Sequence, residues 1–140
     1  CALSGPRHGM ASNAMLALAD EAAHRGAKTA IAAWLDRHHS LPGFGHPLYP
    51  GGDPRATAML AGLVPDPVLA SLASAAAAVV GAPPNCDFAI AVLVRSYRLR
   101  ADAGFRIFAL SRSIGWAAHA MEQAATGQII RPRGRYVGPR

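Results

Sequence analysis

Apolar residues recur along most of this sequence with the spacing of one face of an α-helix. Between about Ala11 and His24, Met15, Leu18 and Ala22 lie at i, i+3 and i+7, which predicts a helix with one buried stripe. Alanine, the best helix former, is frequent, and no β-branched alternation typical of strands occurs. The pattern therefore predicts an all-α protein. Further helices are expected at about 28–38, 54–63, 67–80, 87–99 and 102–125.

Capping residues and prolines mark where these helices begin. Ser12 or Asn13 is placed to cap the first of them, and Asp53 is placed to cap a short helix with Pro54 in its first position. Asp87 lies at or near the N-terminus of the helix at 87–99, where an ionised carboxylate is favoured. On the residues alone, a helix cap explains Asp87 more simply than a catalytic role does.

The segment LPGFGHPLYPGGDPR, residues 41–55, interrupts the helical pattern with four glycines and four prolines. Such a composition excludes helix interior and central strand. The prolines and the apolar side chain of Phe44 predict a rigid loop, not a flexible linker. Because the loop carries His46 and Arg55, we interpret it as a built site in which glycines let a ligand approach the backbone. An ordinary surface loop with a solvated histidine is the alternative.

The helix at 102–125 has two distinct faces. One of them carries Phe108, Arg112 and Gly115 at successive turns. Such a face could bind an anion through the arginine or could simply be exposed to solvent. The tail IIRPRGRYVGPR, residues 129–140, has no helical period and is predicted to be extended. Its arginines would bind nucleic acid, be exposed to solvent or reach into a neighbouring subunit. The other face of the helix is apolar and consists of Ile107, Leu110, Ile114, Ala118 and Met121.

Charge narrows the class of ligand. The 140 residues suffice for one domain and carry a net charge of +6, with Lys28 as the sole lysine. Arginine grips carboxylate and phosphate through two parallel hydrogen bonds, which fits an anionic small substrate, a CoA-type phosphate or nucleic acid. No zinc finger, heptad zipper or aromatic–basic RNA signature accompanies the charge, so nucleic acid is disfavoured.

Other chemistries have little support. Cys1 and Cys86 define no disulfide framework or metal spacing, and the adjacent His38 and His39 would point about 100° apart on a helix. The apolar run at 68–80 is shorter than the roughly 20 residues that span a bilayer. We therefore expect a cytoplasmic protein without a metal site or membrane span. The sequence begins with Cys1 and not with methionine, and its first residues are typical of the interior of a longer sequence. We therefore expect a fragment or a processed chain.

Five segments in order resemble the C-terminal part of the citrate synthase family. The resemblance runs from Leu3 to Gly138, although Met10 stands where the family usually has a second glycine after its histidine. It implies a small helical domain with its leading helix over 1–101, then a C-terminal helix and extended tail over 102–140. The family's N-terminal large domain is absent from this sequence. The segments are GPRHGMASNAM, PGFGHPLYPGGDPRA, PPNCDF, LSRSIGWAAHAMEQ and IIRPRGRYVGP.

The resemblance implies roles for individual residues. Asp87 matches the general base that removes a proton from the methyl carbon of an acyl-CoA thioester. His8 matches the histidine that hydrogen-bonds the thioester oxygen, and His46 the histidine that polarises the oxaloacetate carbonyl. One carboxylate base with donors at two oxygens suits the deprotonation of so weak a carbon acid.

The resemblance also implies binding residues. Arg55, Arg112 and Arg131 match arginines that hold the carboxylates of oxaloacetate, and Arg131 would act in the partner subunit of a homodimer. Phe108 matches an aromatic residue beside the site. No metal or organic cofactor is implied, since the CoA thioester is itself a substrate. The segments that meet CoA contain Gly43, Phe44, Gly45 and Asn85.

The function implied is condensation of acetyl-CoA with oxaloacetate to citrate and CoA, as part of a longer or complemented protein. A 2-methylcitrate synthase and a citryl-CoA lyase are alternatives within the family. From another class, the chain would be a non-catalytic CoA-binding subunit or a fragment that pairs with a separate large-domain chain. A nucleic-acid-binding arginine tail is a third possibility, which predicts steep salt dependence.

Overall fold

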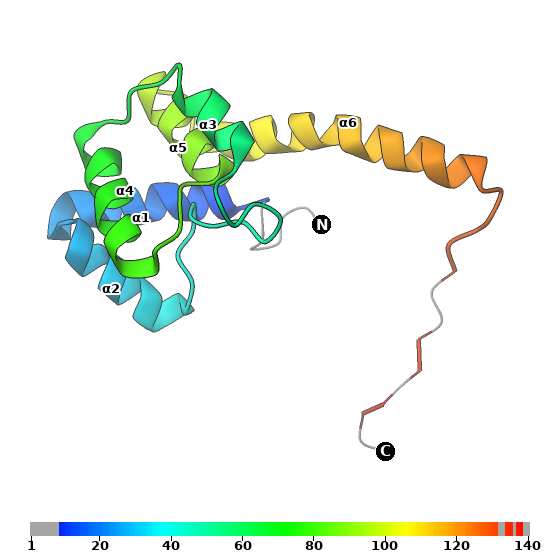
Figure 1. Cartoon of the computed structure of the whole chain (residues 1–140), viewed down its shortest axis with the longest axis horizontal. Coiled ribbons are helices and arrows are strands. Elements are labelled where there is room, and N and C mark those ends of the chain that lie inside the picture. Colours follow the sequence, from blue (N-terminus) through cyan, green and yellow to red (C-terminus); the bar gives the residue numbers. More distant parts are fainter. Residues whose placement is uncertain (1–8, 132–133, 136, 139–140) are drawn as a thin grey trace. The chain divides into compact units, whose positions relative to one another are not determined.

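The computed structural model describes residues 9–131, 134, 135, 137 and 138. These residues contain six α-helices and no strand, which confirms the predicted all-α class (Figure 1). An isolated β-bridge pairs Phe44 with Pro84. The helices are α1 (Ala11–Arg25), α2 (Ala27–His38), α3 (Pro54–Leu60), α4 (Pro67–Val80), α5 (Cys86–Ser96) and α6 (Ala103–Ala125).

The chain splits into two compact units, Cys1–Ala109 and Leu110–Arg140, so the division falls inside α6. The first unit contains α1 to α5 and the first turns of α6. The boundary predicted between residues 101 and 102 stays a prediction. No described helix is both long and apolar enough to cross a membrane.

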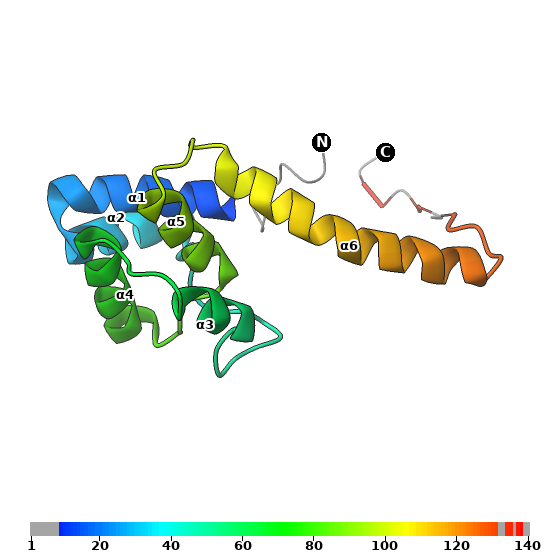
Figure 2. The same cartoon turned by 90° about the horizontal axis from the view of Figure 1, so that it is seen from above.

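Helix α1 contacts α2, α4 and α5, while α4 also packs on α2 and α3 packs on α5 (Figures 1 and 2). The predicted stripe of α1 is confirmed, because Met15, Leu18 and Ala22 are all buried. Leu69 and Leu72 of α4 meet them in the same core. Removing each leucine side chain from water contributes roughly 1.5–3 kcal/mol.

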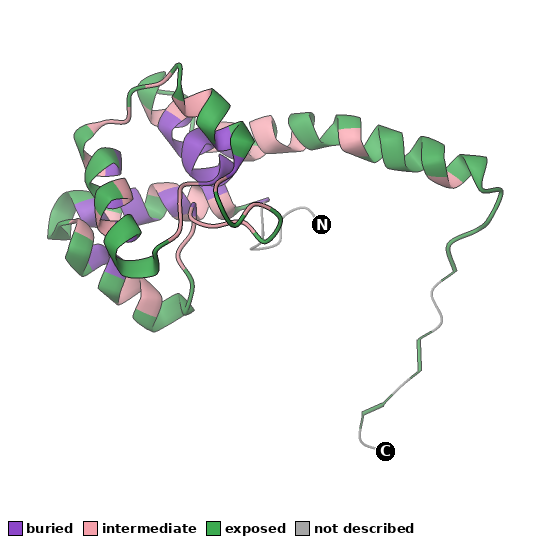
Figure 3. Cartoon of the chain, in the orientation of Figure 1, coloured by how far each residue is buried: buried purple, intermediate pink, exposed green. Residues whose placement is uncertain are grey.

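Helix α5 is the most deeply buried element of the first unit (Figure 3). Phe88 and Val92 face the core, but residues on the other sides of the helix are buried as well. Its first turn is therefore held on several sides by packed neighbours, which fixes the position of Asp87. The buried residues of α5 are Cys86, Asp87, Phe88, Ala89, Ile90, Ala91, Val92 and Val94.

The structure confirms the predicted start of one helix and contradicts the predicted cap of another. Asp53 caps α3 with Pro54 at the start of the helix, as predicted, and its carboxylate accepts from the backbone N–H of Arg55. The predicted capping of α1 is wrong: Met10 is the N-cap and no side chain caps the helix. Ser12 is fully buried instead and lies against Gly104, where an added Cβ would come within 2.6 Å of the Ser12 hydroxyl oxygen.

Two helices end earlier than predicted, and a third is less buried. Helix α3 ends at Leu60 and α5 at Ser96, and the chain after α5 reaches a left-handed conformation at Arg98, with φ of 49°. The nearly all-apolar α4 buries only the side that faces α1 and α2. Val79, near its end, is 55% exposed.

The second unit leaves its large apolar side chains exposed (Figure 3). On α6, Leu110, Ile114 and Met121 are each about three-quarters exposed, at 75%, 76% and 73%. The described residues 128–131 after the helix have no regular structure and are exposed. No described residue of Leu110–Arg140 covers this apolar face.

Candidate functional site

The glycine-rich loop runs beside the segment that leads into α5. The Gly45 N–H donates to the Pro83 carbonyl at 2.8 Å, and the Asn85 N–H donates to the Gly43 carbonyl at 2.9 Å. Gly43 and Gly45 have φ of 81° and 72°, values that L side chains rarely adopt. The backbone of the loop is therefore tied to α5 on both sides of Phe44.

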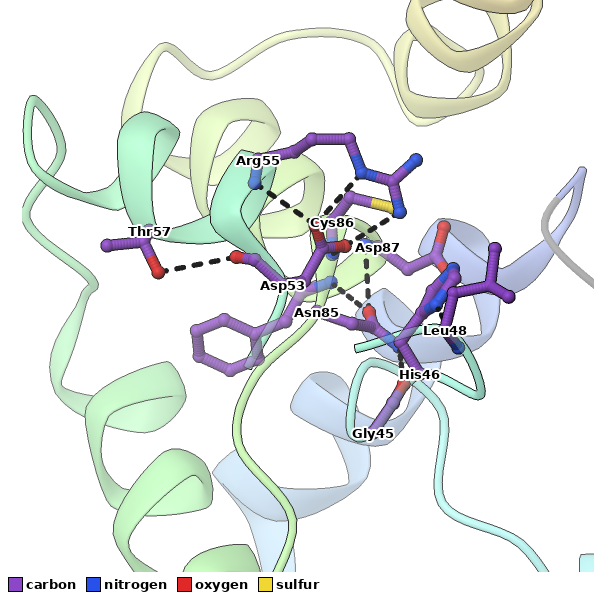
Figure 4. A network of polar contacts seen from close by, with 10 residues as sticks. Gly45, His46, Leu48, Asp53, Arg55, Thr57, Asn85, Cys86 and Asp87 are labelled. Carbon is purple, nitrogen blue, oxygen red and sulfur yellow. Dashed lines mark hydrogen bonds and ion pairs between the residues drawn. The ribbon is translucent and has the colours of Figure 1, made fainter. Parts of the chain in front are cut away.

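Asn85 joins the same loop to α5 through its side chain. Its amide oxygen accepts from the N–H groups of Asp87 and Phe88, at 2.9 and 3.4 Å, and so caps the helix. Its amide nitrogen donates to the Gly45 carbonyl at 2.8 Å (Figure 4). Asn85, and not Asp87, is therefore the cap of α5. The carboxylate of Asp87 is not needed for that purpose.

Asp53 forms a second link between the loop and α5. Its buried carboxylate accepts from Arg55 Nε and Nη2, each at 2.9 Å, and from the Cys86 N–H at 3.1 Å (Figure 4). The Arg55 guanidinium, aided by the N–H groups of Arg55 and Cys86, lowers the pKa of Asp53 to about 2, although burial opposes this shift. Asp53 is therefore ionised at neutral pH.

Tyr49 stands between the two loop residues for which chemistry is predicted. Its ring lies 5.0 Å from the His46 ring, and the Arg55 guanidinium carbon lies 5.5 Å from the Tyr49 ring centroid. The Leu48 N–H donates to His46 Nδ1 at 3.2 Å, so the neutral imidazole carries its proton on Nε2. From the sequence, Tyr49 was taken only as an apolar anchor of the loop and was given no role at the site, although it lies three residues after His46.

Asp87 and Cys86 are the titratable side chains in the first turn of α5. Asp87 is 3% exposed in the first turn of the helix, where the N-terminal dipole favours its charged form. Cys86 is a free, buried cysteine, and burial together with the charge of Asp87 raises its pKa to about 11. The thiol therefore stays protonated at neutral pH and is a poor nucleophile. In Figure 4, Asp87 and His46 lie on the same side of the polar network, away from Thr57.

The structure thus gathers part of the predicted site around the start of α5. His46, Asn85 and Asp87 lie there with the loop residues Gly43, Phe44 and Gly45, and Asp53 connects Arg55 to the same point. The role of each residue stays a prediction. No three His, Cys, Asp or Glu side chains among the described residues gather as metal ligands would.

The other predicted site residues are His8, Phe108, Arg112 and Arg131. His8 lies outside the described residues. Phe108 is partly buried on the part of α6 that belongs to the first unit. Arg112 and Arg131 belong to the second unit, where both are exposed. Their approach to the loop stays a prediction.

Two open grooves lie elsewhere on the first unit. An open groove of about 650 Å³ lies between the start of α2 and α4 and includes Lys28 and Ser71. Another, of about 470 Å³, includes Asp66 and Arg95, which form an ion pair. Neither is lined by His46 or Asp87, so neither adds to the site at the start of α5.

Comparison with known proteins decides the family. Residues 1–133 match the family described as citrate synthase, C-terminal domain. The chain belongs to the citrate synthase family. Citrate synthase 2 of Bacillus subtilis is 34% identical over 149 residues, covering 99% of this chain and 40% of its own length. The 2-methylcitrate synthase of Mycobacterium tuberculosis is also 34% identical, over 98% of this chain and 38% of its own length.

Solved citrate synthases share the fold as well. The enzyme of Thermotoga maritima matches with a TM-score of 0.78 and 29% identity, over 99% of this chain and 41% of its own. The Thermoplasma acidophilum citrate synthase, solved as a ternary complex with carboxymethyl coenzyme A and oxaloacetate, matches with a TM-score of 0.68 and 30% identity, over 99% and 42%. The chain thus spans about two fifths of the length of the citrate synthases that it matches.

Acid is expected to weaken the fold through Asp53. Its pKa is about 2 in the folded chain against an ordinary value of 3.8, mainly because of the Arg55 hydrogen bonds. Such a carboxyl stabilises the folded state above its unfolded pKa and loses that stabilisation as the pH falls. The free energy of unfolding should therefore drop by up to about 2 kcal/mol from about pH 4 to about pH 2 through this group alone.

Urea unfolding at low protein concentration measures this contribution. Asp53→Asn removes the titrating group, so the variant should be less stable than the wild type at neutral pH but should lose less stability in acid. The remaining carboxyl groups are common to both proteins and cancel in the comparison. An equal acid dependence of the two proteins would contradict the expectation.

Proposed function

We propose that this chain forms the C-terminal part of an active site that condenses acetyl-CoA with oxaloacetate to citrate and CoA. The observation that supports this most is the junction at the start of α5. There the helix turn that carries Asp87 is hydrogen-bonded to the loop of His46 and to the Asp53–Arg55 pair. The related Thermoplasma acidophilum complex contains oxaloacetate, which the proposal assigns to this site, together with carboxymethyl coenzyme A, another CoA derivative.

In this mechanism Asp87 takes a proton from the methyl carbon of the acetyl thioester. His8 donates a hydrogen bond to the thioester oxygen as negative charge develops there, since a base alone is insufficient for so weak a carbon acid. The enolate carbon then bonds to the carbonyl carbon of oxaloacetate, while His46 donates a proton to that carbonyl oxygen. Hydrolysis of the resulting citryl thioester by water releases citrate and CoA.

The geometry of His46 suits this assignment. Because Nδ1 accepts from the Leu48 N–H, the neutral ring presents Nε2–H as a donor. The dicarboxylate needs cations nearby, and Arg55, Arg112 and Arg131 are proposed to supply them through paired hydrogen bonds. Phe108 is proposed to border the substrate. The proposal requires no metal or organic cofactor.

CoA is proposed to lie along the backbone of the loop at Gly43, Phe44 and Gly45. Asn85 was predicted to meet CoA, and its side chain already caps α5 and bonds Gly45. Its proposed contribution to CoA binding is therefore to hold the loop in place. Because glycine has no side chain, the backbone atoms of Gly43 and Gly45 are not covered by a side chain of their own.

The choice of acyl group is a matter for experiment. The relatives named citrate synthase 2 and 2-methylcitrate synthase are equally similar to this chain, at 34% identity. Acetyl-CoA and propionyl-CoA differ by one methylene, which a pocket distinguishes by only about 1–3 kcal/mol. Measuring kcat/KM for both thioesters in an active assembly identifies the substrate, and the same assay run on citryl-CoA tests the lyase direction.

The chain by itself is expected to associate and to show no condensation activity. It spans two fifths of its relatives, and its second unit exposes an apolar face on α6, which favours association. Adding an N-terminal citrate synthase segment, such as that of the Bacillus subtilis relative, should restore CoA release. In that assembly Arg131→Ala should raise the KM for oxaloacetate, because Arg131 is proposed to complete the site of a second copy in a homodimer.

Sedimentation and a CoA-thiol assay test this expectation. A monomer that condenses both substrates unaided would contradict it. An assembled protein that binds CoA without turnover would instead support the non-catalytic alternative.

A further inference from the structure

The carboxylate of Asp53 contacts two segments that the proposed reaction needs in fixed positions. Its Oδ2 accepts from Arg55 Nη2 and from the N–H of Cys86, the residue before Asp87, and its Oδ1 accepts from Arg55 Nε. We propose that Asp53 is a positioning residue that presents Arg55 to a substrate carboxylate and fixes it relative to Asp87. The inference rests on the proposed function and extends it to how the anion site is oriented.

Arg55 is constrained on one edge and one face. The edge formed by Nε and Nη2 is bonded to Asp53, and the Tyr49 ring lies against the guanidinium. The described residues give Nη1 no hydrogen bond, and the side chain of Arg55 is 53% exposed. The edge formed by Nη1 and Nη2 is thus open, and it matches the two oxygens of a carboxylate.

Fixing an arginine before its ligand arrives strengthens binding. A free arginine loses much rotamer entropy when it is ordered, and Asp53 imposes that order in advance. The negative charge of Asp53 acts in the opposite direction, because it reduces the attraction of Arg55 for another anion. Since Asp53 leaves one complete edge available, we expect orientation to outweigh this loss.

Asp66 provides a matched control for this role. It also caps a helix just before a proline, accepts from the N–H groups of Val68 and Leu69, and forms an ion pair with Arg95. Its carboxylate does not bond to the start of α5, and none of its partners is a predicted site residue. Asp53→Asn and Asp66→Asn therefore remove the same kind of ion pair while leaving a residue that still caps a helix, but only the first should affect Arg55.

The side-chain Nε–H signals of arginine in NMR spectra of the chain test the inference directly. In the wild type and in Asp66→Asn, the Arg55 Nε–H should exchange slowly and should shift when oxaloacetate is added. In Asp53→Asn the Arg55 Nε–H should exchange rapidly, and the Kd for oxaloacetate should rise by between about tenfold and a hundredfold. In an active assembly the KM for oxaloacetate should rise similarly, while the KM for acyl-CoA should stay within about twofold of the wild type.

Several results would overturn the inference. One is a wild-type chain whose Arg55 Nε–H signal does not shift when oxaloacetate is added. Another is an Asp53→Asn variant that binds oxaloacetate with the Kd of the wild type. A third is an Asp53→Asn variant that binds oxaloacetate more tightly, which would make Asp53 a competitor of the substrate. If circular dichroism shows that Asp53→Asn does not fold, Asp53→Glu keeps the charge but displaces it, and the same rise in Kd is expected. An inactive wild-type assembly with Asp53-dependent oxaloacetate binding would refute the proposed reaction and support the positioning role.

Discussion

Replacing Asp87 by asparagine in an active assembly should lower the turnover of acetyl-CoA and oxaloacetate by about 10²–10⁴, the usual contribution of a positioned general base. Asparagine has nearly the same size, and the cap of α5 is Asn85, so the fold should change little. Oxaloacetate should still bind, since its proposed contacts are arginines and His46. Release of CoA thiol measures the effect.

Asp102→Asn is the control for a carboxylate at a helix start. Asp102 immediately precedes α6, forms ion pairs with Arg100 and Arg106, and has no proposed role in catalysis. Its replacement should leave turnover within about twofold of the wild type. Near-normal turnover of the Asp87 variant would refute the assignment of Asp87 as the base.

Replacing Gly43 by alanine should destabilise the first unit by about 2–5 kcal/mol, the sum of left-handed strain and overpacking. Gly43 has φ of 81°, and an added Cβ would lie 2.7 Å from Met15 Sδ and 3.2 Å from Phe88 Cβ. Met15 and Phe88 are fully buried, so they have little room to move. Urea unfolding of the variant and the wild type gives the difference.

Gly81→Ala separates strain from crowding. Gly81 also has positive φ, at 61°, but an added Cβ would have nothing within 4 Å. This change should therefore cost only about 1–2 kcal/mol. If Gly43→Ala costs no more than Gly81→Ala and instead raises the KM for acyl-CoA, then contact with CoA, and not core packing, is what requires glycine at position 43.

Much of the fold was predictable because the signals are local. The apolar spacing of Met15, Leu18 and Ala22 identified the buried side of α1, and Asp53 with Pro54 identified the start of α3. Local rules failed where packing between distant segments decided the outcome. Ser12 was a reasonable cap by residue type, but its burial against Gly104 gave it a different environment.

The sequence by itself determined the all-α class, the glycine–proline loop that interrupts the helices and, through five motifs in order, the family. Helix periodicity, capping and proline geometry act over a few residues, and motif order is a property of the chain alone. Only the tertiary structure showed that Asn85 is the cap that also bonds Gly45, 40 residues earlier, and that Asp53 bonds Cys86, 33 residues later. Such links depend on where the packed helices place the loop and the start of α5, because a buried polar group is paired with groups that lie near it in space, whatever their separation in sequence.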